Sequence, residues 1–136
     1  MFLLDTNVVS EVRKGHRSDP NVSTWYASVD ESDLFISPLT LGEIRKGIEL
    51  ARRRGDSRQA DVLSGWLKTV IERFSGRVLT VDPQVADTWG QMLAIRPIPL
   101  IDGLLAATAV VHDLTLVTRN VSDVEGLGAR LLNPFD

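Results

Sequence analysis

Short apolar runs alternate with longer segments of helical periodicity along the whole chain. Runs of four or five residues rich in Leu, Val, Ile and Phe are typical of buried strands. Five such runs are predicted to be strands: residues 1–5, 34–37, 77–81, 115–118 and 129–133. Because helical segments separate most of them, the pattern predicts an α/β protein, a three-layer α/β/α sandwich around a largely parallel five-stranded sheet. In such sheets ligands bind beyond the carboxyl ends of the strands.

Cap signals mark where the predicted helices begin. A capping residue is followed by proline at three places: Asp19-Pro20, Ser37-Pro38 and Asp82-Pro83. This pairing is typical of an N-cap and the first helical position. The chain from 38 to 74 is predicted to be a helical hairpin, broken at Gly55-Asp56 and projecting from one side of the sheet.

The remaining boundaries are set by polar residues that follow apolar runs. The first helix is predicted over 6–15, capped by Thr6 or Asn7. A helix rich in small residues is predicted over 103–113, and these small side chains allow the helix to pack closely on the sheet. Residues 119–128 are predicted to be a glycine-punctuated loop.

Length and composition indicate one domain, 1–136, that can bury a hydrophobic core without disulfide bonds or a structural metal. The chain is 43% hydrophobic and 24% charged, which is typical of a globular protein. It has no long apolar run and no leader pattern, so we expect a cytoplasmic protein without a membrane partner. With no cysteine and only two histidines, any metal site must be built from oxygen ligands.

The charge balance argues against a protein that binds nucleic acid over its whole surface. The formal net charge is −3 and the isoelectric point is about 5.3, whereas such proteins usually carry a basic excess. Phosphate contacts must therefore be local. Two basic stretches offer them, Arg45 to Arg54 and Arg13 to Arg17, although a solvated helix face explains single charges equally well.

Four acidic residues lie where a predicted strand ends or near the start of a predicted helix or turn: Asp5, Glu43, Asp102 and Asp123. Each alone has a structural explanation as a cap, a turn residue or a surface residue. Their shared placement instead predicts one cluster of carboxylates, which repel unless a cation lies among them. Mg²⁺ and Mn²⁺ prefer oxygen ligands, so the pattern indicates metal-dependent chemistry. Leu39, Leu41, Ile44 and Ile48 further predict that Glu43 is surrounded by buried residues.

Four segments in order, LLDTNVVSE, TLGEIRKGI, IDGLLAATA and LTLVTRNVSDVEGLGARLLNPF, resemble the PIN-domain ribonucleases of the VapC and FitB toxin type. The resemblance runs from residue 2 to residue 135. It implies a metal-dependent endoribonuclease, the toxin of a type II toxin–antitoxin module, that cuts RNA and is inhibited by a VapB-like antitoxin. Transfer RNA is the commonest substrate class that it implies.

The resemblance also assigns roles. Asp5, Glu43 and Asp102 match the three acids of the family's metal site, and Asp123 matches a variable fourth position for which Asn120 is the alternative. Asn7 and Thr118 match polar residues that flank the site. One or two Mg²⁺ or Mn²⁺ ions are implied, and attack by water predicts 5′-phosphate and 3′-hydroxyl products.

Other classes fit the sequence less well. A receiver-type phosphoacceptor domain needs a lysine late in the chain, but the last lysine is Lys68. A haloacid-dehalogenase-type phosphatase needs an aspartate at position 7, which is Asn7. A catalytically silent PIN-like module that binds RNA or a partner remains the alternative.

An assembly is also expected. The long hairpin from 38 to 74 offers more apolar surface than a core of this size absorbs. We expect a homodimer through helices that carry Trp25, Leu39, Leu41 and Trp66, and a heterotetramer or larger complex with the antitoxin. Trp89, at a helical position, is expected in the core or at a subunit contact.

Overall fold

Four short parallel strands form the centre of the protein, here a computed structural model that describes residues 1–136. The sheet order is β2-β1-β3-β4. The strands are β1 (Phe2–Leu4), β2 (Leu34–Phe35), β3 (Thr115–Val117) and β4 (Arg130–Leu132). All three pairings are parallel, with Leu4 opposite Val117 at the carboxyl ends of the two central strands. The expected parallel α/β architecture is confirmed.

Of the five predicted strands, the one at 77–81 is not formed: it is reduced to a single parallel bridge between Val78 and Ile36. Two backbone hydrogen bonds hold it, from Ile36 N to Arg77 O (3.1 Å) and from Leu79 N to Ile36 O (2.9 Å). The segment that follows β2 leaves the sheet at Ser37, the N-cap of the next helix. Residues 80 and 81 therefore have no adjacent backbone with which to pair, and the apolar run does not extend into a strand.

Seven helices surround the sheet, joined in two places by single turns of 3₁₀ helix at Gly15–Arg17 and Glu31–Asp33. They are α1 (Thr6–Arg13), α2 (Pro20–Ser28), α3 (Pro38–Arg53), α4 (Ser57–Arg73), α5 (Pro83–Ile95), α6 (Leu100–Val111) and α7 (Val121–Val124). The side chains of Asp19, Ser37 and Asp82 each accept a hydrogen bond from a backbone N–H of the first turn. The three predicted caps are therefore confirmed.

Other helix boundaries differ from the prediction. The cap of α1 is Asp5, rather than Thr6 or Asn7, because the Asp5 carboxylate accepts the Thr6 N–H. Helix α6 begins at Leu100, so Asp102 lies within its first turn. Four residues of the predicted loop 119–128 form the short helix α7.

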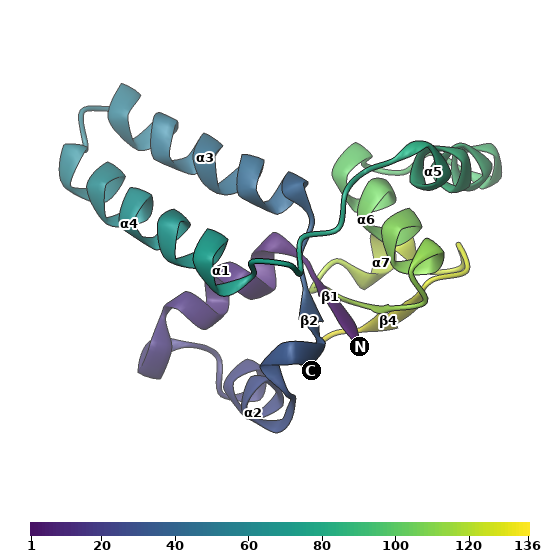
Figure 1. The fold of residues 1–136 in the computed structure, drawn as a ribbon, viewed down its shortest axis with the longest axis horizontal. Helices are drawn as coiled ribbons and strands as arrows, with labels where there is room; N and C mark the ends of the chain where they lie inside the picture. The colour runs from purple at the N-terminus through teal and green to yellow at the C-terminus, as the bar shows by residue number, and fades with distance from the viewer.

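The sheet separates two cores, because side chains of a strand alternate between its faces. Leu4 and Val117 pack with α1, α3 and α4 on one face, and Leu3 and Leu116 pack with α5 and α6 on the other. Figure 1 shows the α3–α4 hairpin projecting on one side and the α5–α6 pair on the other. The carboxyl ends of β1 and β3 lie between these two arms.

The α5–α6 pair packs closely at a glycine beside Asp102. A Cβ placed on Gly103 would lie 3.1 Å from Trp89 Nε1 and 3.2 Å from Trp89 Cδ1. A side chain at this position would require the indole to shift by a few tenths of an ångström. Trp89 is thereby partly buried against the second core.

Trp25 and Trp66 are likewise partly buried against the first core, and the Trp25 ring meets Phe2 edge to face, with centroids 5.3 Å apart. Leu39 and Leu41 are also partly buried. These residues have intramolecular partners but stay partly exposed, and the expected dimer surface stays a prediction. By length and apolar content no single helix can cross a membrane, although α5 and α6 meet that test jointly across a 120° bend.

Candidate active site

Asp5 lies at the carboxyl end of β1 and is 5% exposed. Its Oδ1 accepts a hydrogen bond from the Thr6 N–H (2.6 Å), and its Oδ2 accepts one from the Thr118 hydroxyl (2.7 Å). The Asn7 amide adds a longer contact to Oδ2 at 3.3 Å. Both carboxylate oxygens are therefore held in a fixed orientation at the end of the sheet.

The polar residues around Asp5 connect two parallel strands. Thr118 follows β3 directly, and its hydroxyl also accepts the Asn120 N–H at 2.9 Å. Asn7 Oδ1 accepts the Arg119 N–H at 3.3 Å. The structure thus brings together Asp5, Asn7, Thr118 and Asn120, which the sequence placed at strand ends and helix starts.

Glu43 lies on the second turn of α3 and is exposed, which contradicts the expectation that buried residues surround it. The buried stripe of α3 consists of Thr40, Ile44, Ile48 and Ala51, and Glu43 lies about a quarter turn away from it. Its Oε1 accepts a hydrogen bond of 2.5 Å from the Thr6 hydroxyl, which lies 3.2 Å from the Thr40 hydroxyl. Thr6 therefore links Glu43 to Asp5, a role that the sequence reasoning missed although Thr6 stands between Asp5 and Asn7.

Asp102 and Asp123 face each other from α6 and α7. Burial, together with the charges of Asp5 and Asp123, raises the pKa of Asp102 to about 6. A hydrogen bond with the Asn120 side chain opposes this rise. The side chains of Asp123 and Asn120 therefore both interact with Asp102. Asp123 is the predicted fourth acid of the site and Asn120 is the alternative to it, so both candidates lie next to the same carboxylate.

The pKa of Asp5 is raised in the same way, by burial and by a neighbouring negative charge. Burial raises its pKa above the ordinary value of 3.8, hydrogen bonds from Thr118 and Thr6 oppose the rise, and the charge of Glu43 adds to it. No three acidic or histidine side chains converge closely enough to hold a metal ion in this arrangement. Mutual repulsion among like charges favours such a spread.

Arg96 holds the segment that carries Asp123, a role that the sequence did not reveal. Its guanidinium donates to the backbone carbonyls of Asp123 (3.1 Å) and Glu125 (2.8 Å) at the end of α7. The sequence placed Arg96 in a proline-marked loop, and the lone arginine there was the only available signal. Arg96 therefore positions α7 against the α5–α6 connection.

An apolar pocket of about 220 Å³ lies among α1, α2 and α4 rather than at the carboxylates. Leu4, the residue before Asp5, and two arginines are among the residues that line it. Its lining residues are Leu4, Val9, Val12, Arg13, Tyr26, Trp66, Thr69, Val70, Arg73 and Phe74.

Comparison with known proteins agrees with this architecture. The family described as PIN domain matches residues 2–122, and the chain therefore belongs to the PIN-domain family. It is 33% identical to "Toxin FitB" of Neisseria gonorrhoeae over 143 aligned positions, covering 99% of each chain. It is 31% identical to "VapC ribonuclease Y4jK" of Sinorhizobium fredii, covering 100% of this chain and 99% of that protein.

The crystal structure of FitAcB from Neisseria gonorrhoeae has the same fold, with a TM-score of 0.89 and 31% identity over 99% of each chain. Both the family match and this structure span β1, the hairpin and α6, which carry Asp5, Glu43 and Asp102. The resemblance noted from four sequence segments is thereby confirmed.

Proposed function

We propose that this chain is a metal-dependent endoribonuclease, the toxin of a type II toxin–antitoxin module, that acts on RNA in the cytoplasm. The observation that carries the proposal is the gathering of acids near the carboxyl ends of β1 and β3. The charges of Asp5 and Asp123 add to the burial that raises the pKa of Asp102, and the charge of Glu43 adds to the burial that raises the pKa of Asp5. Relatives named as a toxin and as a ribonuclease share the whole length of the chain.

The donor set fits Mg²⁺ or Mn²⁺. The nearby side chains offer carboxylate, amide and hydroxyl oxygens, which are the ligands that hard cations prefer. Asp5 and Asp102 would be the principal ligands, with Asp123 beside Asp102. Rotation of their side chains would be required, since no three of them converge as they stand. The ion would supply a water of lowered pKa and neutralise charge on the phosphate.

The protein's own residues set the orientation of these groups. Thr118 and Thr6 donate to opposite oxygens of Asp5, so the carboxylate cannot rotate freely. Thr6 also orients Glu43, which is exposed and free to accept a proton from the attacking water. Attack by water on the phosphorus breaks the bond to the 3′ oxygen and leaves a 5′-phosphate and a 3′-hydroxyl. Structured RNA, with transfer RNA first, is the proposed substrate class.

A VapB-like antitoxin is the proposed partner. The pocket among α1, α2 and α4 suits an apolar segment of the antitoxin, because most of its lining residues are hydrophobic. An antitoxin arginine that reached the acids would gain bidentate hydrogen bonds from their carboxylates. Titration of the cognate antitoxin should show weaker binding to Glu43→Gln than to wild type and no change for the distant Asp30→Asn. Equal affinity for all three would remove the arginine contact.

A homodimer is also proposed, and a further apolar surface is available for it beside the helices named from the sequence. Leu93, Ile95 and Leu100 are 37%, 63% and 57% exposed at the corner between α5 and α6. An apolar corner of this kind is a candidate subunit contact. Light scattering that shows only monomer at high concentration would reject the dimer.

The central test is RNA cleavage by the purified chain. Wild type should cut RNA with added Mg²⁺ or Mn²⁺, while Asp5→Asn and Asp102→Asn should not, with circular dichroism showing that both fold. Asp30→Asn is the matched control and should cut normally. Full activity in excess EDTA would contradict the metal dependence, and a folded wild type that binds RNA but never cuts it would leave the silent PIN-like module as the function.

A further inference from the structure

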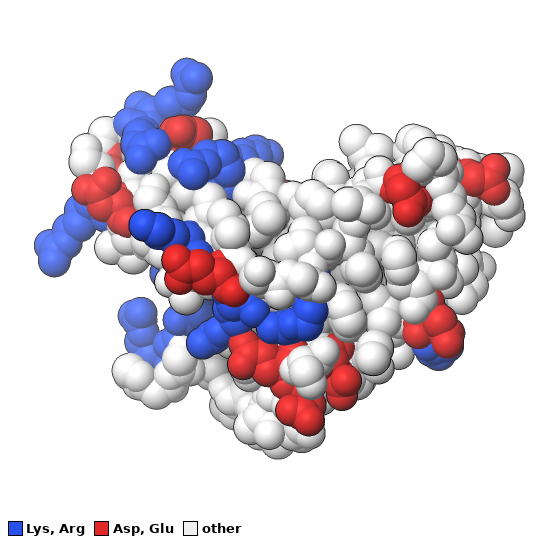
Figure 2. All heavy atoms as spheres, viewed as in Figure 1, with Lys and Arg blue, Asp and Glu red and all other residues white.

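The α3–α4 hairpin differs in charge from the rest of the chain. Residues 38–73 contain eight Lys or Arg and five Asp or Glu, whereas the remainder contains seven basic and thirteen acidic residues. Figure 2 shows the basic side chains gathered over the hairpin, while the side formed by α5 and α6 carries few charges. The protein is therefore acidic overall but carries one basic arm.

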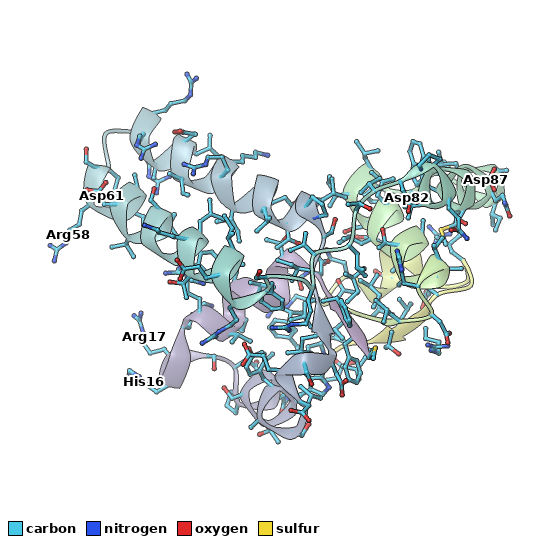
Figure 3. The ribbon with its side chains drawn as sticks, in the orientation of Figure 1. His16, Arg17, Arg58, Asp61, Asp82 and Asp87 are labelled. Atoms are coloured by element: carbon cyan, nitrogen blue, oxygen red, sulfur yellow. The ribbon has the colours of Figure 1, made fainter.

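Basic residues without a close ion pair are spread along the hairpin: Arg45, Lys46 and Lys68 lie on its helices, and three arginines lie where α3 turns into α4. Arg52 is neutralised by Glu49 at 3.0 Å, but Arg53 and Arg58 form no ion pair, and Arg54 only approaches Asp56 at 3.9 Å. All three are exposed. Arg58 extends from the hairpin end into solvent, away from the rest of the molecule (Figure 3). Three guanidinium groups are thus available at one end of the arm.

Helix stability explains only part of this charge. Arg53 lies in the last turn of α3, where a cation interacts favourably with the helix dipole. Arg58 is the second residue of α4, at the positive end of that helix, where a cation is unfavourable. A residue placed against the helix dipole points to a role outside the folding of the hairpin.

The distance from the acids limits what this end can contact. Glu43 and Arg53 are ten residues apart on one continuous helix, which separates them by about 15 Å along its axis. The arm is rigid, because Ile44, Ile48 and Ala51 of α3 share a buried core with Ala60 and Leu67 of α4. The hairpin end therefore cannot touch the phosphate that is cut, but it lies at a fixed separation from it.

We propose that Arg53, Arg54 and Arg58 form a second phosphate-binding site for the RNA substrate, separate from the acids. This inference rests on the proposed ribonuclease function and adds a condition to it. An RNA long enough to reach from the carboxylate site to the hairpin end binds at both sites. A short oligonucleotide binds at the carboxylate site alone. Selection of long or folded RNA then follows from the length of α3 rather than from reading of bases.

The test measures binding of bulk transfer RNA at several salt concentrations, in an Asp102→Asn background that prevents cleavage. The triple change Arg53→Gln, Arg54→Gln and Arg58→Gln should reduce the slope of log affinity against log salt by roughly 2 to 3, because each phosphate contact releases about one counterion. The same three positions changed to Lys should keep the slope. Arg130→Gln, an exposed arginine on β4 outside both basic stretches, is the control and should leave the slope unchanged.

Cleavage separates this proposal from the proposed function. With otherwise wild-type protein, the triple Gln variant should raise KM for bulk transfer RNA at least tenfold and leave cleavage of a short oligonucleotide with the same cut site unchanged. An unchanged salt slope and KM in a folded variant would overturn the second site and leave the hairpin end to a protein partner. Failure of wild type to cut any RNA would instead overturn the proposed function.

Discussion

The Thr118 hydroxyl donates a hydrogen bond of 2.7 Å to Oδ2 of Asp5, although the two residues are 113 positions apart in the chain. The bond joins the carboxyl ends of the two central strands and is fully buried. It opposes the effect of burial on the pKa of Asp5. A single hydroxyl therefore helps to keep the most buried acid of the site ionised.

Thr118→Val should lower both stability and RNA cleavage. The change removes the donor to Asp5 and the acceptor of the Asn120 N–H, and an unsatisfied buried polar group costs about 1–3 kcal/mol. Thr118→Ser keeps the hydroxyl and should restore most of both properties. Urea denaturation and initial rates on one RNA measure the two effects, and equal behaviour of Val and Ser at this position would contradict the role of the hydroxyl.

Asp102→Asn should stabilise the metal-free protein at pH 8 while abolishing cleavage. The pKa of Asp102 is raised to about 6 in the folded state, so the folded state binds more protons than the unfolded state between about pH 4 and pH 6. The contribution of Asp102 to wild-type stability therefore falls as the pH rises through that window and stays lower above it.

For this partly exposed group, solvent screening reduces the gain from Asp102→Asn to about 1 kcal/mol. Thermal unfolding in EDTA at pH 4 and pH 8 measures it. The variant should differ from wild type at pH 8 and approach it at pH 4. A variant less stable than wild type at pH 8 would show that Asp102 is not destabilised by its neighbours.

Arg96→Ala should loosen α7 and reduce cleavage without unfolding the protein. The change removes two hydrogen bonds to the carbonyls of Asp123 and Glu125. Arg96→Lys restores a charge but cannot span both carbonyls, so it should rescue only in part. Hydrogen exchange should accelerate at residues 121–125 and remain unchanged in α3. Unaltered exchange in α7 would mean that Arg96 does not hold this segment.

Gly103→Ala should be less favourable than a Gly→Ala change at an uncrowded helix position, by about 1–3 kcal/mol, because overpacking forces the Trp89 indole to move. The added Cβ would lie 3.1 Å from Trp89 Nε1. Gly47→Ala on α3 is the matched control, since nothing lies within 4 Å of its Cβ position. That change should instead stabilise by about 0.5–1 kcal/mol. Tryptophan fluorescence reports whether the ring moves in the first variant alone.

Features encoded in neighbouring residues were predictable from the sequence. The caps Asp19, Ser37 and Asp82 depend on a local side-chain bond to the next turn and on the proline that follows. Asp5 and Thr118 follow apolar runs that could only be strands. Because parallel strands end at one edge of a sheet, their proximity followed from the fold class.

Features that depend on distant partners were not predictable. The run at 77–81 has strand composition, but whether it pairs depends on where β2 leaves the sheet. Glu43 is exposed because burial on α3 follows one narrow stripe, which composition around a residue does not reveal. Arg96 acts through carbonyls 27 and 29 positions away, and no local pattern marks those contacts.

The central place of β1 in the sheet also governs when the site can form during synthesis. β1 begins at Phe2 and pairs with β3, which begins at Thr115. A ribosome that adds about 5–20 residues per second releases the first acid seconds before the strand that buries it. Translation that stops before Thr115 yields a chain with Asp5, Glu43 and Asp102 but without Thr118 or α7. Completion of about the last sixth of the chain is therefore the step that assembles these carboxylates, and a truncated product leaves them unassembled.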